Sequence, residues 1–265
     1  MKKERLILVS NDDGIHAKGL ENLIEAAREF GRVVVAAPAE AMSGMSHAIT
    51  IKTPLRSREI RHEKDLSVYS CQGTPVDCIK LALNQLLDEK PDIVLSGINH
   101  GSNSSASVVY SGTMAAAMEG CVNQIPSAGF SLLNYEPDAD FSAAVKIVKK
   151  VIQNIIDNGL KKGTCLNVNI PAIPFEKING IKICRQTKGY WKEEFVKRTD
   201  PHQGEYFWLT GYYYNMELES EDTDEYALQN NYVSVVPIKV DLTDYDSLRD
   251  LKKWNLNHFD NQETP

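Results

Sequence analysis

Side chains that carry oxygen atoms follow three separate apolar runs of this sequence, and together they could bind a divalent metal ion. Carboxylate, hydroxyl and carboxamide oxygens are hard ligands that suit Mg²⁺, Mn²⁺ or Ca²⁺ better than a metal that prefers thiolates. Two adjacent aspartates also repel each other unless a cation or hydrogen bonds stabilise both charges. An Asx turn or a helix cap would use only one of them. The residues concerned are Asn11, Asp12, Asp13, Ser43 and Asn99.

A second set of residues could hold an anion beside that metal. The stretch 97–105 is rich in glycine, serine and asparagine, and it lies between an apolar run and a helix that opens at Ser111. Backbone N–H groups of such a loop, with the positive end of the following helix, favour bound phosphate. The residues predicted to contact phosphate are Asn11, Gly101, Ser102, Asn103, Ser111, Gly112 and Thr113.

The apolar runs before these loops predict a parallel α/β sheet. Residues 6–9, 33–37 and 92–95 are continuous apolar segments, as expected for strands buried on both faces. Apolar residues at helical spacing from Leu20 to Ala27 complete a β-α-β unit within the first 40 residues. In such sheets ligands bind outside the carboxyl ends of the strands, so the three loops are expected to converge there.

The rest of the chain continues this pattern and then changes character. Thr74 and Pro75 are a typical N-cap and first residue of a helix. Residues 48–51 and 66–69 resemble short strands, and we interpret them as an excursion from the sheet. Further helices are predicted at 113–118 and 141–155, and further strands at 128–133, 167–170 and 233–238.

Three units are predicted along the chain. Residues 1–181 form a Rossmann-like core, a mainly parallel sheet flanked by helices. Residues 182–230 form a hairpin-rich appendage for oligomerisation, because the aromatic clusters 206–208 and 212–214 suggest hairpins. Residues 231–265 supply a strand and a helix that return to the core or are exchanged between subunits.

Composition excludes several classes of function. A formal net charge of −7 and a pI near 5.4 argue against binding a nucleic acid polymer through its phosphates. The five cysteines are widely spaced without a C-x-x-C pair, which disfavours zinc and a disulfide framework. The apolar run after the basic start is too short for a signal peptide, and no stretch has membrane-spanning length. We therefore expect a cytoplasmic protein without a membrane partner.

Five blocks in order along the sequence resemble a known family. They are LVSNDDGI at 8–15, MSGMS at 42–46, GTPVDC at 73–78, LSGINHG at 95–101 and YSGT at 110–113. These are similar to the signature blocks of the SurE family, stationary-phase survival proteins that act as nucleotidases. The resemblance is close over the first half of the chain and continues more loosely through 233–244.

The resemblance implies a 5′-nucleotidase, a phosphoric monoester hydrolase that acts on nucleoside 5′- and often 3′-monophosphates and in some members on short polyphosphate. It also implies one divalent cation per subunit, Mg²⁺ or Mn²⁺, bound by Asp12, Asp13, Ser43 and Asn99. Asp12, which would also position water, and Asn11 are the predicted catalytic residues. Residues 39–42, which are Ala-Glu-Ala-Met, lack the basic residues usual in the family. Family members are homodimers or homotetramers that exchange C-terminal elements.

Two other classes of protein also place aspartates after their first strand, but they fit this sequence less well. Haloacid-dehalogenase-type phosphatases place two aspartates at i and i+2, whereas Asp12 and Asp13 are adjacent. A receiver-like signalling domain uses an Asp-Asp pair to hold Mg²⁺, but it is about half this length and needs a phospho-acceptor aspartate where this chain has Asn99. Ser46 resembles a nucleophile elbow, but a strand-like segment follows it where a helix is required. The sequence identifies no general acid for the leaving group, although His100 could in principle reach it. His62, His202 and His258 are interpreted as surface residues.

Overall fold

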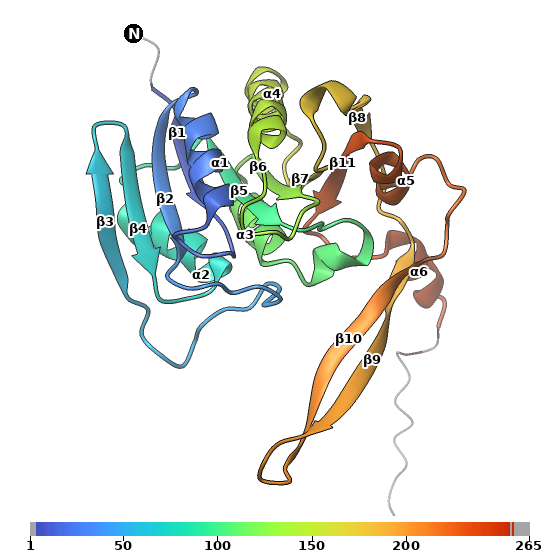
Figure 1. Ribbon diagram of the computed structural model, residues 1–265. Coiled ribbons are helices and arrows are strands. Elements are labelled where there is room, and N and C mark those ends of the chain that lie inside the picture. The colour runs from blue at the N-terminus through green and yellow to red at the C-terminus, as the bar shows by residue number, and fades with distance from the viewer. Residues whose placement is uncertain (1–3, 255, 257–265) are drawn as a thin grey trace, which may run out of the picture.

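The structure is a computed structural model that describes residues 4–254 and 256. A nine-stranded sheet forms the centre of the molecule (Figure 1). Its strand order is β3-β4-β2-β1-β5-β6-β7-β11-β8. The strands from β4 to β7 run parallel to one another, while β3 and β11 run antiparallel to β4 and β7. The strands are β1 (Leu6–Ser10), β2 (Arg32–Pro38), β3 (Ser57–Glu63), β4 (Leu66–Cys71), β5 (Ile93–His100), β6 (Ser127–Leu132), β7 (Thr164–Ile170), β8 (Gly180–Ile183) and β11 (Tyr232–Lys239).

Helices cover both faces of this sheet. On one face lie α1 (Lys18–Arg28) and α4 (Ser142–Asn158). They pack against Ile7 and Val9 of β1 and against the side chains of the neighbouring strands that point to the same face. On the opposite face α2 (Pro75–Leu81) and α3 (Gly112–Val122) pack against Leu6 and Leu8. Central strands buried from both sides explain the continuous apolar runs in the sequence. The predicted α/β fold with a mainly parallel sheet flanked by helices is confirmed.

Two helices begin at the caps that the sequence predicts. Thr74 caps α2 in a capping box with Asp77, and Pro75 is its first residue. The Ser111 hydroxyl caps α3 by accepting a hydrogen bond from the backbone N–H of Met114 at 3.0 Å. The α2 helix continues into a π-helical turn at Ala82–Leu86. A short 3₁₀ helix, η2 (Ser105–Val109), precedes α3.

The segment 48–71 differs from the prediction. No strand forms at 48–51, and the strand lies instead at β3, whose side chains are mostly exposed. The segment is also not an excursion, because β4 pairs with β2 and β3 pairs with β4 in the main sheet. The sequence pattern of β3 is polar because an edge strand does not need to bury both faces.

In the C-terminal half of the chain, one long antiparallel hairpin projects from the core (Figure 1). It consists of β9 (Gly189–Thr199) and β10 (Glu205–Asn215). The aromatic clusters 206–208 and 212–214 both lie in β10, so the described residues 182–230 form one hairpin where the sequence suggests several.

The chain returns to the core after the hairpin. The helix α5 (Asp224–Gln229) leads into β11, and α6 (Tyr245–Leu251) follows the sheet. The division at 181 and 230 stays a prediction, although β8 crosses the first boundary. His258 and the end of the predicted third unit lie outside the described residues. A search of the described helices for a membrane-spanning segment finds none of sufficient length and apolar character.

Candidate active site at the carboxyl edge of the sheet

A cavity of about 410 Å³ lies where the loops after β1, β2 and β5 meet, at the sheet edge from which the hairpin projects (Figure 1). The fold therefore brings together residues that the sequence predicted to converge from three loops. It is lined by Asp12, Ser43, Gly44, Asn99, His100, Ser102, Asn103, Ser107, Tyr110, Ser111, Tyr135 and Trp191.

Asp12 is the carboxylate at the base of this cavity. It is buried, with 4% of its surface exposed, and burial raises its pKa to about 6. A hydrogen bond from the Thr113 hydroxyl opposes that rise, and the negative charge of Asp13 adds to it. A Cβ atom on Gly112 would lie 2.7 Å from the Asp12 Cβ, so only glycine lets the start of α3 approach this carboxylate so closely.

Of the other three predicted metal ligands, Ser43 and Asn99 line the cavity together with Asp12, whereas Asp13 lies outside its lining. The backbone N–H of His100 donates to the Asp13 carboxylate at 3.1 Å, while burial raises the Asp13 pKa. The Asn99 amide group donates to the Gly101 carbonyl at 2.8 Å, so its side-chain oxygen is the atom that could bind a cation. Ser43 is brought near because the backbone N–H of Met42 donates to the Asp12 carbonyl at 2.7 Å.

An irregularity in β5 places Asn99. The register of β5 against β6 shifts between Ser96 and Asn99. A Cβ on Gly97 would lie 2.4 Å from the Phe130 carbonyl oxygen, and its φ is +122°, so glycine is required at this position. Bulges of this kind often re-aim a side chain beside an active site.

The donor set fits a hard divalent cation. Two carboxylates, a hydroxyl and a carboxamide are all oxygen donors. Over residues 4–254 and 256, no three His, Cys, Asp or Glu side chains form a metal-binding cluster. The burial that raises the pKa of Asp12 and Asp13 also makes an added positive charge favourable.

The predicted phosphate loop forms one wall of the cavity. Asn103 is fixed by hydrogen bonds from its backbone N–H to Asn169 at 2.8 Å and from its amide to Ser131 at 2.9 Å. The Ser102 and Ser104 hydroxyls are hydrogen-bonded at 2.6 Å. Ser111 places the N-terminal end of α3 at the cavity, where its partial positive charge favours an anion.

Several predicted site residues do not line the cavity. Asn11 is buried with its amide donating to the Gly14 carbonyl at 2.8 Å, and its side-chain oxygen has no hydrogen-bond partner among the described residues. Its catalytic role stays a prediction. Gly101, Gly112, Thr113 and Asp13 also lie outside the lining, but each contacts a residue that belongs to it. Gly101 accepts a hydrogen bond from Asn99, and Asp13 accepts one from the backbone N–H of His100. Gly112 and Thr113 both contact Asp12.

Three aromatic residues at the cavity were missed by the sequence reasoning. Tyr110 and Tyr135 flank the phosphate loop, and Trp191 comes from β9. Tyr110 immediately precedes the Ser-Gly-Thr segment, which is a signal that could have found it. Trp191 lies far along the sequence from the other lining residues, and only the position of the hairpin shows that it reaches the cavity.

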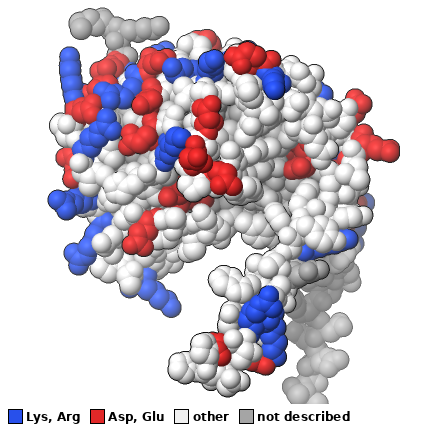
Figure 2. All heavy atoms as spheres, in the orientation of Figure 1, with Lys and Arg blue, Asp and Glu red and all other residues white. Residues whose placement is uncertain are grey.

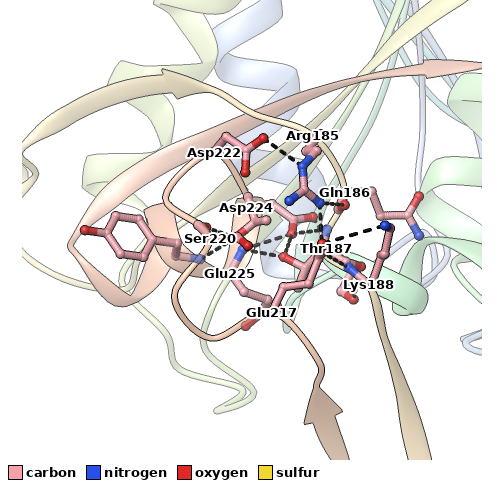
Figure 3. A network of polar contacts seen from close by, with 12 residues as sticks. Arg185, Gln186, Thr187, Lys188, Glu217, Ser220, Asp222, Asp224 and Glu225 are labelled. Atoms are coloured by element: carbon pink, nitrogen blue, oxygen red, sulfur yellow. Dashed lines mark hydrogen bonds and ion pairs between the residues drawn. The ribbon is translucent and has the colours of Figure 1, made fainter.

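A polar network joins the phosphate loop to the root of the hairpin, and Figure 3 shows its part around Arg185, Thr187 and Asp224. The Asp224 carboxylate, which is fully buried, accepts from the backbone N–H groups of Ser105 at 2.8 Å and Thr187 at 2.9 Å. The Ser104 hydroxyl donates to Glu225 at 2.5 Å. Arg185 bridges Glu217 and Asp222, each at 2.8 Å. The hairpin root and the cavity wall are thereby held in one arrangement.

The interpretation of Ser46 as a loop residue agrees with its contacts. Its hydroxyl donates to the Val109 carbonyl at 2.7 Å, and its backbone N–H donates to the Tyr110 carbonyl at 3.2 Å. These bonds tie the Ser43 loop to the segment before α3. His100 lines the cavity, and its ring packs edge-on against Phe141 with 5.1 Å between centroids.

A larger cavity of about 790 Å³ lies elsewhere and is lined mainly by apolar side chains, among them Val108, Val236 and Ile238. Among the described residues no carboxylate side chain lines it, and Gln186 is the one amide side chain in its lining. The smaller cavity is therefore the candidate active site.

Comparisons with known proteins find relatives over nearly the whole chain. Residues 7–193 match the family described as "Survival protein SurE". A protein of Christiangramia forsetii named 5′-nucleotidase SurE is 50% identical over 97% of this chain and 99% of its own length. One of Phocaeicola vulgatus with the same name is 49% identical over 97% and 99%. The crystal structure of the SurE protein from Aquifex aeolicus superposes with a TM-score of 0.81 at 39% identity and covers 93% of this chain and 98% of its own.

Proposed function

The chain belongs to the SurE family, and from this premise we propose that its polar cavity hydrolyses nucleoside 5′-monophosphates to a nucleoside and phosphate. The observation that carries this function is identity of about one half, over nearly the whole length, with proteins named 5′-nucleotidase SurE. The chain is therefore a phosphatase of nucleoside monophosphates, and the haloacid-dehalogenase and receiver alternatives are not favoured. Action on 3′-monophosphates and short polyphosphate is a further part of the proposal.

We propose that Asp12, Asp13, Ser43 and Asn99 hold one Mg²⁺ or Mn²⁺ ion. When bound, such an ion neutralises charge on phosphate oxygens and favours activation of water. The all-oxygen donor set and the burial of Asp12 support this proposal. SurE nucleotidases depend on metal in general, whereas the identity of the ion and its number per subunit belong to the proposal.

The protein's own groups have separable roles in the proposed reaction. Asp12, held by Thr113, orients the attacking water. The N-terminal end of α3 at Ser111 and the loop carrying Ser102 and Asn103 bind phosphate oxygens, which places the phosphorus for in-line attack. The short bond network behind Asn103 keeps this wall rigid, so the site is organised before substrate arrives.

A phosphate-release assay tests the function and the metal together. Nucleoside 5′- and 3′-monophosphates, sugar phosphates and tripolyphosphate are supplied with Mg²⁺ or Mn²⁺. We expect activity that is greatest on nucleoside 5′-monophosphates, is lost on chelation with EDTA and returns when Mn²⁺ or Mg²⁺ is added back. Full activity in excess EDTA, with metal absence confirmed by elemental analysis, would refute the metal proposal and leave the hydrolase in place.

We also propose a homodimer or homotetramer in the cytoplasm. Phe207 and Trp208 on the hairpin are more than half exposed, which supports a second subunit as their partner. All five cysteines are free and buried in the described structure, which supports a reducing compartment.

A further inference from the structure

The active-site cavity continues into a second cavity of about 460 Å³. The two cavities share Gly44, Tyr110 and Trp191 as lining residues. From there the second cavity extends to Leu209, Thr210 and Gly211 on β10. Figure 2 shows the surface hollowed between the hairpin and the core. A molecule whose phosphate lies beside Asp12 would therefore direct its other end toward the hairpin root.

Trp191 is held firmly at this junction. It pairs with Tyr213 across the hairpin ladder, and the two rings meet edge-on with 6.1 Å between centroids. The Tyr213 and Ser105 hydroxyls are hydrogen-bonded, and the Ser105 hydroxyl also bonds the Thr187 carbonyl at 2.8 Å. The indole thus has a fixed position relative to the phosphate loop.

The walls of the second cavity are chemically unlike those of the first. An indole, a phenol ring and a leucine side chain offer flat and apolar surface, and glycines leave room beside them. Among the described residues that line it, none has a charged or amide side chain. Such walls bind a planar ring by stacking. Tyr110 and Thr210 each bring one hydroxyl, but the described lining has no arginine, amide or carboxylate side chain that could hold a base edge at two points.

We propose that this second cavity, walled by Tyr110, Trp191 and Leu209, is the subsite for the nucleobase of the substrate, and that it selects for an aromatic ring without distinguishing base edges. This rests on the proposed nucleotidase function. Every base has a face that can stack, so nucleotides with the same ring system and different edges, such as AMP and IMP, are hydrolysed with kcat/KM values within about threefold of each other.

Kinetics of a Trp191→Leu variant on AMP and on ribose 5-phosphate test this subsite. Ribose 5-phosphate has the same phosphate ester but no base. We expect the variant to lower kcat/KM for AMP by about five- to a hundredfold, mainly through KM, with ribose 5-phosphate changed less than about twofold. Trp191→Phe keeps an aromatic ring and is expected to retain most of the preference for AMP.

Tyr190→Leu is the matched control, because Tyr190 is the preceding residue on β9 and its side chain points to the opposite face of the hairpin. It is expected to leave both substrates unchanged. Equal losses on AMP and ribose 5-phosphate in Trp191→Leu, or no loss on AMP, would overturn the subsite. If the wild-type protein hydrolyses neither substrate, the proposed function fails instead.

A binding measurement on the wild-type protein does not depend on any variant folding. Adenosine and ribose are titrated calorimetrically into the full chain in the presence of EDTA. Adenosine is expected to bind at least about fivefold more tightly than ribose because its ring stacks on the indole. Equal affinities would contradict the proposal.

Discussion

At the scale of single residues, burial places the two site aspartates in an unfavourable environment. Burial raises the pKa of Asp12 to about 6 and raises that of Asp13 as well, because a charged carboxylate is poorly solvated there. A site that keeps two neighbouring carboxylates for function gives up stability to do so. The protein without metal should therefore gain stability when one of these charges is removed.

Asp12→Asn and Asp13→Asn test this directly. Each is expected to lower kcat by orders of magnitude, because each removes a proposed metal ligand. At pH 7 in EDTA, the melting midpoint is expected to be unchanged or raised, because the folded pKa of each carboxyl is raised and ionisation opposes folding there. Below about pH 3, under the unfolded pKa of about 3.9, both carboxyls are largely protonated in either state, so that gain should vanish.

The melting midpoint with and without Mn²⁺ provides the second measurement. Wild-type protein is expected to be stabilised by Mn²⁺, because a ligand that binds only the folded state stabilises it, and neither variant should show the same shift. Asp157→Asn, an exposed position on α4, is the control and should resemble the wild type. Wild-type turnover in either site variant at limiting metal would contradict the role of that aspartate.

At the scale of elements, one carboxylate joins the start of α2 to the loop that follows Ser43. The Asp77 carboxylate accepts from the backbone N–H of Thr50 at 2.9 Å, from its hydroxyl at 2.6 Å and from the backbone N–H of Thr74 at 2.9 Å. The Thr74 hydroxyl donates to the Ala48 carbonyl at 2.7 Å. The cap of α2 therefore also fixes a segment that has no regular structure of its own.

Asp77→Asn should destabilise the protein in a way that depends on pH. Burial acts to raise the Asp77 pKa, but the hydrogen bonds from Thr50 and Thr74 outweigh it and hold the pKa below its usual range. Stability from this carboxylate is therefore full above its unfolded pKa of about 3.9 and is lost as the pH falls through the lower folded pKa. We expect the variant to lose about 1–3 kcal/mol at pH 7.

Urea unfolding of wild type and variant at pH 7 and near pH 3 measures this effect. The difference in the free energy of unfolding should shrink on acidification. The exposed Asp157→Asn change should cost less than about 0.5 kcal/mol at either pH. A difference that stays constant with pH would show that Asp77 acts through packing and not through its charge.

The parts of the fold that the sequence predicts are those with strong local signals. Buried strands such as 6–10 and caps such as Thr74 and Ser111 are recognised because periodicity and capping are local properties. The polar strand β3 was missed because an edge strand has no apolar alternation. Trp191 was missed for a different reason, since only long-range packing brings the hairpin root to the cavity.

The family blocks, in turn, predict the composition of the site better than its geometry. Asp12, Ser43 and Asn99 converge as expected, because carboxyl ends of parallel strands share one edge. Asn11 does not reach the cavity, because its amide closes the turn at Gly14. The register shift that aims Asn99 depends on the contact of Gly97 with β6, which no single segment encodes.

At the scale of the whole molecule, the hairpin presents apolar surface that the other described residues do not cover. Phe195, Phe207, Trp208 and Leu209 are each more than half exposed. A two-stranded hairpin is marginally stable alone in water and needs another surface to pack against. Its root is fixed by Tyr213 and the Asp224 network, whereas its outer half projects away from the core (Figure 1). A second subunit would supply the missing surface.

Shortening the hairpin should therefore lower the oligomeric state. Replacing residues 196–208 by a short Gly-Ser turn removes the outer half, including Phe207 and Trp208, and keeps Trp191 paired with Tyr213 at the root. By sedimentation equilibrium, the intact chain is expected to be a dimer or tetramer and the shortened chain a smaller species, because burial of exposed aromatic surface drives association. Phe175→Ser, an exposed aromatic position on the core, should leave the assembly unchanged. An intact chain that sediments as a monomer, or a shortened chain that assembles as fully as the intact one, would contradict a role for the hairpin in joining subunits.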